Sequence, residues 1–208
     1  MGLDLLALPS VVLVAVTAIG ILISHAWRWV ISLLMIQYAG IFILVGISWP
    51  FQMALTKLIA GLMAGVILFI AHSSLEAKDQ DQDQTRHPPL LNSQTELSGR
   101  LFRLFAASLV GLVIVSGSRV IVQWLPGLSS EQILGSTILI GLGLLHLGLT
   151  SEPFRVVVGL LTVIAGFEIA YAGIEVSALV QGLLAVVTLG LGLVGAYLVL
   201  APTMERIE

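Results

Sequence analysis

The chain has 208 residues, of which 58% are hydrophobic and only 10% charged, and its mean hydropathy is +1.07. Soluble domains have about 45–50% apolar and about 25% charged residues, so this composition excludes an ordinary soluble protein and indicates an integral membrane protein. The net charge is −3 and cysteine is absent, which excludes disulfides, thiolate metal sites and thiol catalysis.

Apolar runs of about 20 residues recur along the chain, each long enough to cross roughly 30 Å of hydrocarbon as a helix. The Pro-containing pairs Trp49-Pro50 and Glu152-Pro153 fall between runs, where proline costs little. We therefore predict an all-α integral membrane protein, a bundle of about seven transmembrane helices. The predicted spans are residues 5–24, 29–48, 51–71, 101–124, 132–150, 156–173 and 178–200.

One long polar segment interrupts this series between the third and fourth spans. Residues 73–99 are low in complexity, and residues 79–84 read DQDQDQ. Such composition is typical of a flexible linker. We predict three parts: residues 1–72 as a three-helix half, 73–99 as a polar cytoplasmic linker, and 100–208 as a four-helix half with a short C-terminal tail.

Lysine and arginine are distributed unequally between the two sides of the predicted bundle. With the N-terminus outside, the inner side holds seven basic residues and the outer loops hold none. The positive-inside rule therefore predicts an outer N-terminus and a cytoplasmic C-terminus, in a bacterial plasma membrane or a thylakoid-type membrane. The inner residues are Arg28, Lys78, Arg86, Arg100, Arg103, Arg155 and Arg206.

Three charged residues, Lys57, Arg119 and Glu168, lie deep inside predicted spans. An ion at the bilayer centre costs roughly 2.5–3.5 kcal/mol on insertion scales, so such residues usually face a protein interior or a wet pathway. Each lies about five or six residues from the predicted outer end of its span, or roughly 8–9 Å at 1.5 Å per residue. We expect them to share one layer, where a pair would offset much of the desolvation cost.

Two interpretations of this layer stay open. In the functional one, Glu168 is a proton relay poised by a nearby cation, with Lys57 beside it and Glu175 seven residues on, near the same helical face. In the structural one, an ion pair holds the helices together, and Arg119 extends outward to the membrane surface.

His146 lies about four residues from the inner end of the fifth span. A histidine in a membrane helix either forms a hydrogen bond to a neighbouring helix or takes part in proton transfer or metal binding. Because no second histidine or carboxylate stands three or four residues away, we predict no metal or other cofactor. Nucleotide-binding and nucleophile motifs are also absent from the sequence, so we predict no independent catalytic site and no nucleic-acid partner.

Glycines recur at helical spacing in two spans. Gly61 and Gly65 form a GxxxG pattern in the third span, and Gly159, Gly166 and Gly173 recur every seven residues in the sixth. Small residues on one stripe let helices approach closely in lipid. Glu168 is two residues after Gly166, about 200° around the helix, so the sixth span is expected to pack on one side and present its acid on another.

The chain resembles the hydrogenase-4 membrane component E family. Leu55-Thr56-Lys57-Leu58-Ile59 is similar to an "ITKxLLxP" stretch of that family, and residues 155–168, RVVVGLLTVIAGFE, are similar to its "R…GxxxxEN" pattern. At the position of the family glutamate this chain has Ile164, and Glu168 follows one turn later. The last part is also similar to the K subunit of NADH–quinone oxidoreductase and to its small counterpart in the cation/proton antiporters that are built from several subunits.

This resemblance implies a small membrane-arm subunit of a complex I-related or hydrogenase/antiporter-like assembly, in contact with lipid and with antiporter-like subunits. Glu168 and Lys57 would contribute to translocation of protons or another cation. The alternatives are a stand-alone small transporter and a purely structural or assembly subunit. A stand-alone transporter predicts ion flux through the purified protein reconstituted alone. A structural or assembly subunit predicts that disrupting the glycine packing prevents assembly, whereas replacing Glu168 leaves ion translocation unchanged.

Overall fold

The computed structural model describes residues 4–82, 93–124 and 127–204. This part of the chain is helical, and it contains seven helices long and apolar enough to cross a membrane, which confirms the predicted all-helical membrane protein. The helices are α1 (Asp4–Ile23), α2 (Trp27–Val45), α3 (Phe51–Gln82), α4 (Ser93–Trp124), α5 (Ser130–Gly148), α6 (Pro153–Ala172) and α7 (Ala178–Met204).

Local sequence signals set several helix ends. Pro50 precedes α3, and Pro153 is the first residue of α6, a position that requires no backbone N–H. At the start of α5, Ser129 and Gln132 exchange side-chain and backbone hydrogen bonds in a capping box, which satisfies two otherwise free N–H groups. The sharp hairpins between spans therefore follow from residues that stop or start helices.

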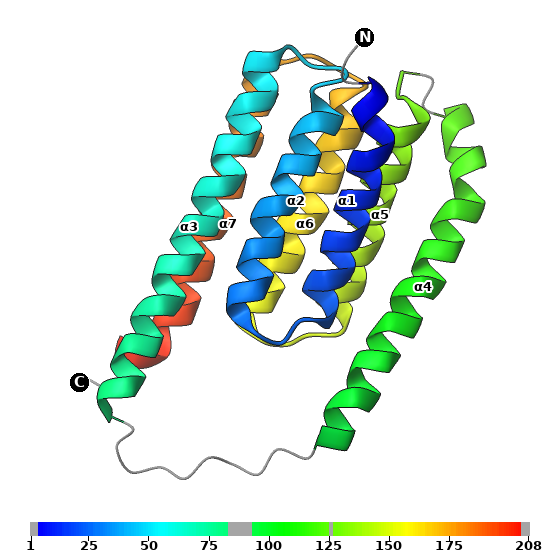
Figure 1. The fold of residues 1–208 in the computed structure, drawn as a ribbon. Helices are drawn as coiled ribbons and strands as arrows, with labels where there is room; N and C mark the ends of the chain where they lie inside the picture. The colour runs from blue at the N-terminus through cyan, green and yellow to red at the C-terminus, as the bar shows by residue number, and fades with distance from the viewer. Residues whose placement is uncertain (1–3, 83–92, 125–126, 205–208) are drawn as a thin grey trace.

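The helices form a bundle (Figure 1), and buried residues are unequally distributed among them. The helices α1, α2, α5 and α6 make up its centre; α3 and α7 pack together along one side, and α4 packs on α5 at the other. In α6, 61% of the residues are buried, against 6% in residues 98–118 of α4. The central helix α6 is therefore shielded from lipid, and α4 turns most of its surface outward.

Both ends of the predicted linker, residues 73–99, are helical. Helix α3 continues to Gln82 and α4 begins at Ser93, while residues 83–92 lie outside the described residues. At the far end of α3, Trp27 donates a hydrogen bond of 2.7 Å to Glu76 and stacks on His72. A helix satisfies its backbone hydrogen bonds internally, so it can extend beyond the apolar run into polar surroundings, and low hydropathy alone does not mark its end.

The two predicted halves share one bundle. Helix α3 of the first half packs mainly on α7 of the second, and α1 packs on α5. The seventh helix is also longer than its predicted span, residues 178–200, because α7 continues through Pro202 to Met204. The structure thus mixes helices from both sides of residues 73–99.

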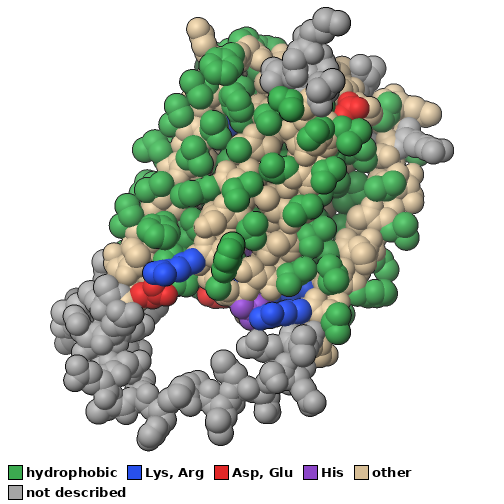
Figure 2. Space-filling model, viewed as in Figure 1, with side chains coloured by type: hydrophobic (Ala, Val, Ile, Leu, Met, Phe, Trp, Pro, Cys, Tyr) green, Lys and Arg blue, Asp and Glu red, His purple; other side chains and the backbone are tan. Residues whose placement is uncertain are grey.

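Figure 2 shows apolar side chains over the length of the visible face; most charged side chains lie at its lower edge, and an acidic side chain lies near its upper edge. We name the two ends of the bundle as drawn: α1 begins at the upper end and finishes at the lower end (Figure 1). The lower end carries Arg28, Arg103 and Arg155, the side for which the positive-inside rule predicts the cytoplasm. That orientation stays a prediction.

Candidate functional site

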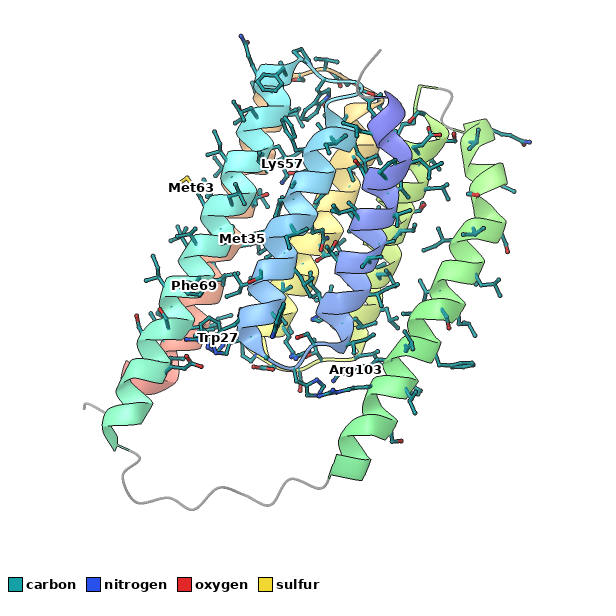
Figure 3. The ribbon with its side chains drawn as sticks, in the orientation of Figure 1. Trp27, Met35, Lys57, Met63, Phe69 and Arg103 are labelled. Atoms are coloured by element: carbon teal, nitrogen blue, oxygen red, sulfur yellow. The ribbon has the colours of Figure 1, made fainter. Side chains whose placement is uncertain are left out.

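A buried ion pair joins Lys57 of α3 to Glu168 of α6. The side chains are only 4% and 1% exposed. Figure 3 shows Lys57 near the upper end of α3, on its side toward α2. The prediction that these two residues lie in one layer and form a pair within the protein is confirmed.

The Lys57 ammonium contacts two more helices besides α6. Its Nζ donates a hydrogen bond of 3.0 Å to Oγ1 of Thr188 in α7, and it lies 5.2 Å from the centre of the Tyr38 ring in α2. A cation within about 6 Å of a ring face is attracted by the ring's electron distribution. The ammonium therefore sits where α2, α3, α6 and α7 meet, with a carboxylate, a hydroxyl and an aromatic ring around it.

Small residues bring α3 close enough to its neighbours for these contacts. A side chain on Gly61 would collide with the Tyr38 ring, and one on Gly65 would press on Met35, so the GxxxG face of α3 packs on α2. On the α7 side, Gly192 lies against Ala64. Lys57 and Gly61 are one turn apart and share a face, so the close approach at Gly61 places Lys57 over Tyr38.

Polar groups near this layer retain unused hydrogen-bonding capacity. Among the described residues, no hydrogen-bond partner is found for the Tyr38 hydroxyl or for either amide atom of Gln37, the preceding residue on α2. Both residues are buried, Gln37 completely. Buried polar atoms normally have a partner, and such atoms are the ones that water or an ion binds.

Helix α6 presents different residues to its two sides. Gly159 lies against Leu147 and Gly166 against Ser136 and Leu139, all of α5, and Gly173 follows the helix and lies against Leu128. The glycine stripe thus packs on α5 and the segment before it, whereas Glu168 reaches α3.

Glu175 and Arg119 are two further residues that the sequence predicts for this site. The sequence predicts Glu175 near the face of Glu168, but α6 ends at Ala172, so helical spacing does not extend to it. Glu175 is exposed, and its carboxylate accepts a hydrogen bond of 3.2 Å from Tyr171. The side chain of Arg119 lies outside the described part of the structure.

His146 is buried at the lower end of α5, against Gly159 of α6. Gly159 precedes Glu168 by nine residues, or about 13 Å along the helix axis. The structure therefore does not bring His146 together with the Lys57–Glu168 pair.

Tyr38 and Thr188 complete the site and are not among the residues predicted for it. A tyrosine and a threonine in apolar runs are too common to draw attention. One signal is present in α7: Gln181 and Thr188 are seven residues apart, on one face of an otherwise apolar helix. Both contact α3, because Gln181 donates a hydrogen bond to the backbone oxygen of Met53 and Thr188 accepts one from Lys57.

This arrangement can hold charge in two states. With Glu168 ionised, the carboxylate and ammonium neutralise each other; with Glu168 protonated, Thr188 and Tyr38 still contact the ammonium.

Comparison of the chain with protein-family models, with curated proteins and with solved structures finds no match.

Proposed function

We propose that this protein is a membrane subunit in which Lys57 and Glu168 take part in moving protons, or another small cation, across the membrane. One observation carries the proposal: an amine and a carboxylate are buried together where α2, α3, α6 and α7 meet in a set of membrane-length helices. Ionisable residues at such depth are costly, and they commonly mark ion pathways and proton relays.

In the proposed mechanism, Glu168 is the group that changes its charge. When it takes up a proton, its attraction for Lys57 falls, and the ammonium turns toward Thr188 and the ring of Tyr38. When Glu168 releases the proton, Lys57 returns to the carboxylate. A cation other than a proton would instead compete with Lys57 for the Glu168 oxygens. The described residues provide no hydrogen-bond partner for the amide of Gln37 or the hydroxyl of Tyr38, which supports hydration of this region.

The proposal includes assembly with larger membrane subunits, as part of a complex I-related or hydrogenase/antiporter-like complex. Its support is the resemblance of residues 55–59 and 155–168, which contain the two members of the ion pair. In such a complex the protein would carry out no redox reaction itself and would provide part of a proton or cation path. Blue-native electrophoresis after gentle solubilisation is expected to place it in a large assembly.

A structural role is the second candidate, and the close packing around the pair favours it. Lys57 bonds to α6 and α7, and small residues hold α3 against α2 and α7. In this case the charges fix the relative positions of helices and no proton moves. Removing one partner of a buried pair costs about 3–5 kcal/mol, whereas replacing both with apolar residues is often neutral or stabilising.

This difference provides the deciding experiment. Lys57→Met, Glu168→Leu and the double variant would be expressed in the native host, with Glu175→Gln as a control that changes an exposed carboxylate. Thermal unfolding of the purified proteins measures stability, and a pH-sensitive dye measures proton movement in membrane vesicles. We expect both single variants to lose stability, and the double variant to recover it while proton movement stays lost.

Recovery of proton movement in the double variant, which has no titratable group at either position, would contradict the proposed relay and favour the structural role. Cation flux through the purified protein reconstituted alone would instead indicate a stand-alone transporter. Glu175→Gln is expected to behave as the unmodified protein in both assays.

A further inference from the structure

Two arginines from different helices meet the end of α1 at the lower end of the bundle. Nη1 of Arg103, on α4, donates a hydrogen bond of 3.2 Å to the backbone oxygen of Leu22. Nη2 of Arg155, on α6, donates one to the backbone oxygen of Ser24. Figure 3 shows Arg103 reaching from α4 toward the lower end of the central helices. Both guanidinium groups therefore lie beside the last residues of α1.

This cluster contains a buried donor that the protein does not use. The Arg155 side chain is only 8% exposed, its Nε donates to Glu152, and its Nη1 has no hydrogen-bond partner among the described residues. His146 is also buried beside it, against the Arg155 backbone and in the field of the Arg155 and Arg103 charges. Among the described residues, neither of its ring nitrogens finds a hydrogen-bond partner of ordinary geometry.

The charges of the cluster do not balance. Arg103 and Arg155 contribute two positive charges, and Glu152, which is 57% exposed and pairs with Arg155, contributes one negative charge. Within the described part of the chain, no ion pair joins Arg103 to a carboxylate. An anion with several oxygens would compensate the excess charge and accept from the unused Nη1, because guanidinium groups match phosphate geometry well.

An apolar surface continues from this cluster along α4. Leu101, Phe102 and Phe105 lie within two residues of Arg103 in sequence, and all three are exposed, as are Leu109 and Leu112 farther along the helix. Helix α4 lies at the side of the bundle, and its lower end extends beyond the central helices (Figure 1), so this surface is accessible from the side. A ligand with a phosphate at one end and hydrocarbon chains at the other matches both parts.

We propose that Arg103, Arg155 and His146 bind the phosphate headgroup of an anionic phospholipid whose acyl chains lie along the apolar surface of α4. The basic distribution of the chain predicts that this end faces the cytoplasmic leaflet, where anionic lipids attract basic groups and where basic pockets between helices bind their headgroups. The site is separate from the Lys57–Glu168 pair and does not depend on the proposed transport function.

The experiment compares Arg103→Gln with Arg28→Gln in the purified full chain. Arg28 provides a matched control, since it lies at the same end and loses the same charge, but it is exposed and paired with Glu76. Titration with phosphatidylglycerol in detergent, followed by native mass spectrometry, measures lipid binding. Because hydrogen bonds to charged groups are strong, we expect binding about tenfold weaker in Arg103→Gln and little changed in Arg28→Gln.

Further measurements distinguish binding of an anionic lipid from binding of any phospholipid or of free phosphate. Phosphatidylcholine and inorganic phosphate, at matched concentrations, are expected to bind much more weakly than phosphatidylglycerol, and Arg103→Lys is expected to retain part of the affinity. Unfolding temperatures without lipid identify any variant that fails to fold, and Arg155→Gln then tests the buried guanidinium. Equal binding of phosphatidylglycerol to Arg103→Gln and the unmodified protein, or equal binding of phosphatidylcholine, would overturn the proposal.

Discussion

The surroundings of Lys57 show how one ammonium is accommodated within membrane-length helices. Its charge is neutralised by Glu168, one of its protons goes to Thr188, and the Tyr38 ring lies over it. These contacts come from three different helices. The position of Lys57 therefore depends on the correct packing of α2, α6 and α7 together, and a change in any of them alters the environment of the charge.

Thr188 provides a direct test of this coupling. Replacing it by Val removes the hydroxyl that accepts from Lys57 while nearly keeping the side-chain shape. Because hydrogen bonds to charged groups contribute about 1.5–3 kcal/mol, we expect Thr188→Val to lower the free energy of unfolding by an amount of this order. Chemical or thermal unfolding of the purified protein measures the loss.

Thr162→Val is the matched control for that substitution. The Thr162 hydroxyl is also buried, but it donates to the Val158 backbone oxygen of its own helix, so its removal is expected to cost less. In the background of Lys57→Met, Thr188→Val should have little further effect. An undiminished loss in that background would show that the Thr188 hydroxyl does not act through Lys57.

Much of this site can be predicted from the sequence, since depth in a membrane is counted in residues. Lys57 and Glu168 lie at similar distances from span ends on one side, and an unpaired charge there is too costly to leave alone. The same reasoning cannot show which way a side chain points. The orientations of Tyr38 and Thr188 are not predicted for that reason, and Glu175 is predicted near the face of Glu168 because helical spacing is extended past the end of α6 at Ala172.

At the scale of elements, α6 contacts two neighbouring helices, α5 and α3, through two different surfaces. Its glycines allow α5 to approach closely, and its acid reaches α3 from another side. Packing with α5 therefore sets where Glu168 is held, although the two surfaces share no residue. Substitutions in the glycine stripe therefore test the interface between α5 and α6 without removing the charge of Glu168.

We expect Gly166→Leu to disrupt the contact between α5 and α6. A Cβ at Gly166 would lie 2.8 Å from the Ser136 backbone oxygen and from Leu139 Cβ, and neither atom can move without shifting α5. Overpacking of this kind typically costs about 1–3 kcal/mol or more. Detergent-solubilised protein should show a lower unfolding temperature and less folded material by size-exclusion chromatography.

Gly182→Leu is the corresponding control on α7. Gly182 is exposed, and no neighbouring atom lies within 4 Å of the position that a Cβ would take there, so the same substitution should be tolerated. Similar losses in the two variants would mean that added bulk in a membrane helix is harmful irrespective of where it lies.

Helix lengths are less predictable than helix positions. The apolar runs indicate the location of all seven helices, because a fixed hydrocarbon thickness demands about 20 apolar residues in each. They cannot indicate the ends of α3 and α4, whose polar extensions satisfy their backbone outside the apolar run. A residue such as Glu76 is compatible with both helix and loop. Its contact with Trp27 joins residues far apart in the sequence, so no local sequence pattern predicts it.

At the scale of the whole molecule, the charge distribution predicts one orientation in the membrane. The chain has no cysteine, so a single introduced thiol reports its own side. Val176, in the loop after α6 at the upper end, and His25, in the loop after α1 at the lower end, are both exposed. We expect a membrane-impermeant maleimide to label Val176→Cys in intact cells, and His25→Cys only after permeabilisation. The reverse pattern would contradict the positive-inside prediction.

The mixing of early and late helices has a consequence for how the protein is made. Lys57 precedes its partner Thr188 by 131 residues, so a ribosome that threads the chain into the bilayer delivers the amine well before α6 and α7 exist. Until then the ammonium lacks the carboxylate of Glu168, and its long stem allows it to reach the lipid–water boundary. Final burial of α3 is therefore a post-insertion event, completed when the last two helices arrive.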